Sequence, residues 1–258
     1  MTLRVDALSV GYAGRSALEP TSLTLGGGEL VGLIGPNGAG KSSLLKAITG
    51  LTPAGGRRHW NGTPLDAMDE RRRARTVAYL PQAPAAHWPM RVRDLVALGR
   101  LPHRAFGQRS SAADTDAVEM AMRQAEIVPL ADRPVDELSG GESARVHLAR
   151  ALAVKAPVLL TDEPVARLDP YHQLQIMSVL GQYAAKNALV VAVLHDLTLA
   201  ARFCSRLLLM YEGRIVEDGM PEAVLRADAL KRYYRIDPYL GRHDGKPLVV
   251  PWKRHRSD

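Results

Sequence analysis

The amino-acid sequence predicts an α/β protein whose parallel sheet carries a phosphate-binding loop. Residues 35–42 read Gly-Pro-Asn-Gly-Ala-Gly-Lys-Ser and match the pattern G-x-x-x-x-G-K-[ST] at every fixed position. The apolar run before the loop, residues 30–34, is typical of a buried strand, and leucine and isoleucine recur at helical spacing from residue 44 to residue 51. Strand, loop and helix in this order predict a site for a nucleoside triphosphate.

The chemistry of polyphosphate explains the spacing within the loop. Glycine at positions 35, 38 and 40 lets the chain bend back so that several backbone N–H groups converge on one anion. Lys41 supplies a charge for the β and γ phosphates, Ser42 a hydroxyl ligand for Mg²⁺, and Ser43 can reach the α phosphate. The expected nucleotide contacts are Gly35, Pro36, Asn37, Gly38, Ala39, Gly40, Lys41, Ser42 and Ser43.

Composition bounds the class of protein only loosely. The net charge of +7, from 34 basic and 27 acidic residues, suits an anionic nucleotide, a membrane surface or nucleic acid equally well. The single cysteine, Cys204, excludes an intrachain disulfide and favours a reducing compartment. We expect no secretory signal, and no apolar run is long enough to cross a bilayer. If the protein works in transport, other subunits must supply the membrane path.

The segments before the loop predict an antiparallel sheet beside the nucleotide core. Residues 3–10 indicate an irregular strand, and residues 18–25 a second strand closed by three glycines. Asn61-Gly62 is a hairpin-turn signal. Tyr12 can stack on adenine or can be an ordinary edge-strand tyrosine, and its position alone favours neither.

From residue 77 the pattern changes from strand to helix. Residues 77–80 predict a strand whose carboxyl end leads to Gln82, which can touch a metal-bound water. Helical patterns then dominate residues 83–137, with helices expected from Val92 to Leu98 and from Ala113 to Val128. This inserted segment can be a lid on the nucleotide or a docking surface for a partner.

A second anion-binding helix start is predicted at Leu138-Ser139-Gly140-Gly141-Glu142, where backbone N–H groups precede an amphipathic run. One nucleotide does not need two such termini from one chain, whereas two chains facing each other would use both.

Carboxylates and a histidine follow the next two predicted strands. Residues 158–161 lead to Asp162, which can hold Mg²⁺ through water, and to Glu163, which can act as general base on the attacking water. The strand at residues 189–194 leads to His195, which can donate to a phosphate oxygen.

Further on, we expect a hairpin at residues 206–217, a helix at 223–234, and a basic tail from Gly241 forming one strand and a frayed end.

Taken together, the phosphate loop, Gln82, the Leu138–Glu142 run, Asp162-Glu163, Asp169 and His195 resemble the ATP-binding subunit of ABC transporters. The resemblance spans nearly the whole chain, and its LSGGE signature between a Walker A and a Walker B motif is highly specific. It implies a P-loop NTPase core with an antiparallel β subdomain and an inserted helical subdomain, the ABC ATPase fold. The implied domain covers residues 1–240, with the helical subdomain at roughly 83–150, followed by a short basic tail, 241–258.

The resemblance also implies an assembly and a division of roles. Two chains form a head-to-tail homodimer with two ATP molecules, each between one Walker A and the other chain's Ser139, Gly140, Gly141, Glu142 and Asp169. Tyr12 becomes the residue that stacks on adenine, Gln82 the γ-phosphate sensor and His195 the switch histidine. The implied catalytic residues are Glu163, His195, Gln82 and Lys41, and the implied Mg²⁺ ligands are Ser42, Gln82 and Asp162.

Three stretches, residues 78–82, 94–100 and 195–202, look like ATPases of iron–siderophore, haem and cobalamin importers. We therefore expect an ATPase at the cytoplasmic face of the inner (plasma) membrane, bound to multi-span permease subunits, served indirectly by a substrate-binding protein, and without direct nucleic acid binding. The alternatives are an importer ATPase for another cargo, a soluble ABC ATPase acting on nucleic acid or ribosomes, and a regulatory module without turnover. Arg167 departs from the family, which has a small residue there.

Overall fold

The structure is a computed structural model that describes residues 1–12, 15–82, 90–105 and 107–255. Its centre is a six-stranded sheet in the order β10-β9-β3-β8-β7-β6. All neighbouring strands in it run parallel except β10, which pairs antiparallel with β9. The strands are β3 (Leu30–Ile34), β6 (Val77–Leu80), β7 (Val158–Thr161), β8 (Leu189–Val193), β9 (Arg206–Tyr211) and β10 (Arg214–Gly219).

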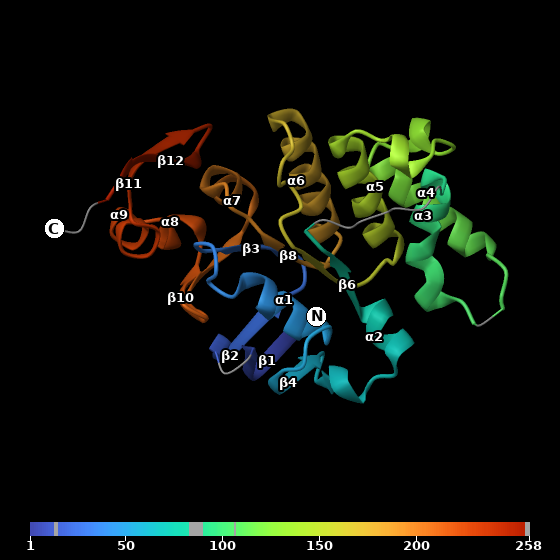
Figure 1. The fold of residues 1–258 in the computed structure, drawn as a ribbon, viewed down its shortest axis with the longest axis horizontal. Coiled ribbons are helices and arrows are strands. Elements are labelled where there is room, and N and C mark those ends of the chain that lie inside the picture. The colour runs from blue at the N-terminus through green and yellow to red at the C-terminus, as the bar shows by residue number, and fades with distance from the viewer. Residues whose placement is uncertain (13–14, 83–89, 106, 256–258) are drawn as a thin grey trace.

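The central strands β3, β7 and β8 are almost entirely apolar because both faces of the sheet are covered. Every residue of β3, β7 and β8 is buried. Side chains of β3 alternate between two cores: Val31 and Leu33 pack in the core that contains α1, and Leu30 and Ile34 in the core on the other face. Figure 1 shows helices α5, α6 and α7 on that other face.

The predicted antiparallel sheet lies beyond α1 (Lys41–Thr49), which packs between it and the central sheet (Figure 1). Its order is β2-β1-β4-β5. Register shifts make β1 irregular, as its sequence predicts. The Asn61-Gly62 turn joins β4 and β5 with both residues at positive φ, 48° and 79°. The strands are β1 (Thr2–Tyr12), β2 (Arg15–Gly26), β4 (Gly55–Trp60) and β5 (Thr63–Pro64). The predicted fold class is therefore confirmed.

The inserted helical segment is present, with one boundary different from the prediction. Helix α2 (Glu70–Thr76) precedes this segment, whose own helices are α3 (Val92–Ala97), α4 (Ala112–Gln124) and α5 (Gly140–Ala153). The predicted helix to Val128 is wrong beyond Gln124, because Glu126 takes a positive φ of 53° and a 3-10 turn follows. At the carboxyl end of α5, Arg100 donates to the carbonyl oxygen of Ala153 at 2.7 Å and to Asp114 at 2.9 Å.

The carboxyl-terminal third departs most from the sequence prediction. After α6 (Pro170–Ala184) and α7 (Leu197–Phe203), the expected helix at 223–234 is instead three short pieces, α8 (Pro221–Val224), α9 (Ala227–Ala229) and a π-helical turn, Leu230–Tyr234. Extended backbone at Arg226 interrupts them.

The expected single strand and frayed end form a hairpin, β11 (Ile236–His243) and β12 (Lys246–Arg254). Its turn, Asp244-Gly245, has both residues at positive φ and is a hairpin signal that the sequence prediction missed. Thr198 of α7 donates to the carbonyl oxygen of Val249 at 2.7 Å, which fixes the hairpin to the core. The predicted boundary between residues 240 and 241 falls inside β11. The hairpin and helices α3 and α4 lie at opposite ends of the molecule (Figure 1).

Candidate functional site

The phosphate loop connects the end of β3 to the start of α1, and its glycines are required for two different reasons. A Cβ on Gly35 would lie 2.2 Å from the carbonyl oxygen of Met210, and one on Gly40 would lie 2.3 Å from that of Ala17. Around Gly38 nothing lies within 4 Å, but its φ is +79°. The loop is therefore packed against β2 and β9 on one side and open on the other, which fits a cradle for phosphate at a helix N-terminus.

The ammonium group of Lys41 lies over this loop. It donates to the carbonyl oxygens of Gly35 and Pro36 at 2.7 and 2.9 Å, and the residue is only 6% exposed. Burial lowers the pKa of Lys41, and the nearby charges of Glu163 and Asp162 oppose that shift. The cation is thus positioned at the loop, with carbonyl oxygens as its partners.

Asp162 connects the loop to the end of β7. Its Oδ1 accepts a hydrogen bond from Ser42 at 3.0 Å and its Oδ2 one from Tyr79 at 3.2 Å. Asp162 is 3% exposed, and burial followed by the charge of Asp162 raises the pKa of the Tyr79 phenol. A serine hydroxyl beside a buried carboxylate at a phosphate loop is a donor set that fits Mg²⁺. Tyr79 is a contact that the motifs did not reveal.

Two other predicted site residues, Gln82 and His195, contact the carboxylate of Glu163. Gln82 donates to its Oε2 at 2.5 Å, and Nε2 of His195 lies 2.6 Å from its Oε1. Glu163 has a φ of 53°, which turns the chain sharply after β7. The strand ends of β6, β7 and β8 thus bring Gln82, Glu163 and His195 together from three separate parts of the sequence.

A cavity of about 220 Å³ lies between the loop and Glu163. Its lining consists of Ala17, Asn37, Gly38, Ala39, Gly40, Lys41, Ser42, Ser43 and Glu163. Tyr12 does not line it; this tyrosine is 47% exposed and its hydroxyl lies 3.5 Å from that of Thr52. Adenine stacking on Tyr12 therefore stays a prediction.

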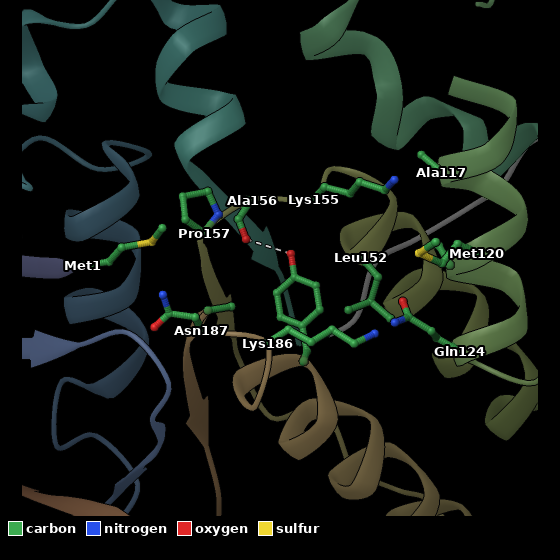
Figure 2. A pocket seen from close by; sticks show the side chains of 13 residues that line it. Met1, Ala117, Met120, Gln124, Leu152, Lys155, Ala156, Pro157, Lys186 and Asn187 are labelled. Atoms are coloured by element: carbon green, nitrogen blue, oxygen red, sulfur yellow. Dashed lines mark hydrogen bonds between the residues drawn. The ribbon is translucent and has the colours of Figure 1, made fainter. Parts of the chain in front are cut away.

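A larger hollow, about 360 Å³, lies among α4, α5 and the carboxyl end of α6 (Figure 2). Lys155 and Lys186 are in its lining, and Tyr183 closes one side by donating to the carbonyl oxygen of Ala156 at 2.7 Å. No residue of the phosphate loop and no carboxylate lines it, so its chemistry does not suit a magnesium nucleotide.

The signature residues begin α5 but do not line the 220 Å³ cavity. Glu142 N donates to the Ser139 hydroxyl at 3.3 Å, and Ser139 N donates to the Glu142 carboxylate at 2.9 Å, a reciprocal cap. The N–H of Ser139, followed by the Ser139 side chain, lowers the pKa of the Glu142 carboxyl. Ser139 and Gly140 are exposed. Asp169 likewise caps α6, accepting from the backbone of His172 at 3.0 Å. Within one chain, therefore, the signature residues do not share a cavity with the phosphate loop.

Known proteins resemble this chain along most of its length. The sequence model of the ABC transporter family matches residues 18–166. The chain is 42% identical over 256 residues to the hemin import ATP-binding protein HmuV of Pseudomonas putida, covering 96% of this chain and 99% of that one. It is also 42% identical over 234 residues to the cobalamin import ATP-binding protein BtuD of Halobacterium salinarum, covering 90% of this chain and 58% of that one.

Solved structures show the same fold. A transporter of metal-chelate type in an inward-facing conformation superposes with a TM-score of 0.82 at 22% identity, covering 96% of both chains. The dimeric bacterial ABC transporter cassette MJ0796 superposes with a TM-score of 0.73 at 25% identity, covering 85% of this chain and 98% of that one. Among the described residues, no helix has the length and apolar character to span a bilayer. The chain therefore belongs to the ABC transporter family, in which it is an ATP-binding subunit whose ATPase activity is coupled to transport.

Proposed function

We propose that this chain powers the import of a chelated metal compound of the haemin or cobalamin type, working as a head-to-tail homodimer that holds two ATP molecules. The cargo class is taken from what the similar import proteins are named for. The observation that supports the dimer is that one chain keeps its phosphate loop and its signature residues in two separate places. The phosphate loop and Glu163 share a cavity, whereas the signature helix start is exposed elsewhere.

In this proposal the chain's own residues divide the work at each ATP. The loop N–H groups and Lys41 bind the phosphates. Ser42 and Asp162, with Gln82, would hold Mg²⁺, which when bound neutralises charge on the phosphate oxygens. Glu163 takes the proton from the attacking water. Gln82 and His195 contact both carboxylate oxygens of Glu163 and so fix its orientation at the end of β7. Ser139 and the first N–H groups of α5 serve the partner chain's nucleotide.

The helical segment is proposed as a docking surface for the permease rather than as a lid. The segment expected to receive a permease helix, residues 83–110, includes residues 83–89 and 106, which lie outside the described part of the chain. Helix α3, which lies within this segment, and α4, which follows it, border a groove of about 380 Å³. Its lining mixes the apolar side chains of Val118, Met122 and Val128 with the charged Arg93 and Arg123, a composition suited to an amphipathic helix.

The test is reconstitution of this chain with candidate permease subunits of a haemin or cobalamin importer. We expect co-purification with a multi-span permease, location at the cytoplasmic face of the membrane, and ATP-dependent uptake of haemin or cobalamin into vesicles once the substrate-binding protein is supplied. A matched complex carrying Glu163→Gln should bind ATP without uptake.

Two results would contradict the proposal. Purification with ribosomes or nucleic acid instead of a permease would favour a soluble ABC ATPase. Absence of steady ATP hydrolysis in the assembled complex would favour a regulatory module.

A further inference from the structure

His172, in the first turn of α6, lies directly against Gly141 at the start of α5. A Cβ built on Gly141 would lie 3.2 Å from both Cγ and Nδ1 of the imidazole and 3.3 Å from Cε1. The backbone at Gly141 does not require glycine, because its φ lies outside the positive range. A side chain at position 141 would therefore require the His172 ring to move by a few tenths of an ångström.

The same imidazole holds Asp169. Its Nδ1 lies 2.8 Å from Oδ2 of Asp169, and the backbone N–H of His172 donates to Oδ1 at 3.0 Å. The N–H of His172, first among several causes, lowers the pKa of Asp169. Asp169 is exposed and caps α6, so its loop faces outward. The side chain of His172 thus contacts both the start of α5 and Asp169, and both are expected at the interface of the proposed dimer.

The contact also crosses a boundary within the chain. Helix α5 belongs to the inserted helical segment and packs against α3 and α4. Helix α6 packs on β8 and β3 of the central sheet. A movement of the helical segment relative to the sheet would change the spacing between Gly141 and His172, and with it the support of Asp169.

We propose that His172 is a positioning residue that fixes the Asp169 loop to the start of the signature helix, so that both meet the partner chain's nucleotide as one unit. This inference rests on the head-to-tail dimer proposed above. Without His172, the two elements have to be ordered separately on closure, so closure becomes less favourable while nucleotide binding to a single chain is unaffected.

Two substitutions separate the two contacts. His172→Asn keeps a side-chain amide where Nδ1 meets Asp169 but removes the ring from Gly141. His172→Phe keeps a ring on Gly141 but loses the side-chain contact with Asp169. His172→Ala removes both side-chain contacts, and in all three variants the backbone N–H of residue 172 still donates to Asp169. Tyr171→Phe is the matched control, because Tyr171 is the neighbouring residue, is 69% exposed, and packs edge-on to His172 through its ring.

Each variant is made in a Glu163→Gln chain, and ATP-driven dimer formation is measured by sedimentation. ATP binding to isolated chains and thermal unfolding are measured alongside. We expect the ATP concentration for half-maximal dimerisation to rise about threefold for Asn and Phe, which each lose one contact, and about tenfold for Ala, which loses both; these changes lie within the range of an ordinary exposed hydrogen bond. Binding to isolated chains and the unfolding midpoint should match the parent, as they should throughout for Tyr171→Phe.

The outcomes separate this inference from the proposed function. If the parent Glu163→Gln chain dimerises with ATP and His172→Ala dimerises equally well, the positioning role is wrong and the dimer stands. If the parent does not dimerise with ATP, the head-to-tail dimer and the role of His172 both fail. Equal losses of dimerisation, nucleotide binding and thermal stability in all three His172 variants would show an ordinary folding defect and would also overturn the inference.

Discussion

Nε2 of His195 lies 2.6 Å from Oε1 of Glu163, while Gln82 occupies the other oxygen of the same carboxylate. The side chain of His195 is 44% exposed and that of Glu163 is 18% exposed. The contact therefore connects a residue facing outward at the end of β8 with one lining the phosphate-loop cavity. In the proposed mechanism, whatever contacts His195 from outside can change the orientation of the base.

Glu163→Gln should slow ATP hydrolysis by roughly 10²–10⁴-fold, because the amide cannot accept the water proton. Its size and its ability to contact Gln82 and His195 are largely retained, so ATP should still bind and the closed dimer should accumulate. Steady-state phosphate release and size-exclusion chromatography with ATP check both parts. Normal turnover in this variant would remove Glu163 from the mechanism.

Lys41→Ala should weaken ATP binding to the isolated chain. The Lys41 ammonium is held on two carbonyl oxygens of the phosphate loop, and its loss leaves phosphate charge uncompensated there. Equilibrium binding of a fluorescent ATP analogue measures the effect. Lys46→Ala, in the last turn of α1, is the matched control and should bind like the parent.

Ser139→Arg should leave ATP binding to an isolated chain intact and should block ATP-driven closure. Ser139 is exposed and does not line the cavity of its own phosphate loop. A long cation at this helix start also opposes the dipole of α5 and removes the cap to Glu142. Binding and dimerisation are measured on the same preparation. Loss of binding in isolated chains would argue against the head-to-tail arrangement.

Asp114→Asn should destabilise the helical segment, because it leaves the Arg100 guanidinium, which belongs to a residue only 6% exposed, without its carboxylate. Breaking a buried pair from one side costs up to about 3–5 kcal/mol of unfolding free energy. Denaturant unfolding measures this, with the exposed neighbour Asp116→Asn as control.

The same pair predicts a dependence of stability on pH. The Arg100 hydrogen bond, first among several causes, holds the pKa of Asp114 below its ordinary value of 3.8. The stabilisation is therefore complete above that value and is lost as the pH falls toward the lower folded pKa. Asp114→Asn should show a shallower loss of stability below about pH 4 than the parent. Parallel curves for the two proteins would show that the pair does not contribute.

Arg167→Ala should reduce the salt dependence of ATP-driven dimerisation if Arg167 adds positive potential near the partner's phosphates. Arg167 is exposed and has a φ of 61°. Alanine at that φ bears similar backbone strain, so the variant isolates the charge. An exposed ion pair would contribute only about 0.2–1 kcal/mol. Dimerisation in Glu163→Gln chains at low and high salt decides this, and parallel curves would make Arg167 a solvated surface residue.

Sequence patterns predicted most of the elements because local periodicity reports which face of an element is buried. The buried runs of β3, β7 and β8 were predictable in this way, and the dipeptide Asn61-Gly62 predicted the turn between β4 and β5. In two places where the prediction was wrong, a residue at positive φ ended or reversed the element, and hydrophobic periodicity does not show such residues. Glu126 leaves helical φ after α4, and Asp244-Gly245 returns the chain as a second strand of the terminal hairpin.

By itself the sequence determined the chemistry of the phosphate loop and the residue types at the strand ends, because both depend on spacing within one short segment. Only the tertiary structure decided that Gln82 and His195 meet on Glu163, that Tyr79 bonds Asp162 and that His172 covers Gly141. These contacts join segments whose order along the chain differs from the strand order β3-β8-β7-β6. Periodicity identifies the buried face of each segment, whereas its neighbour is selected by the packing of the whole chain.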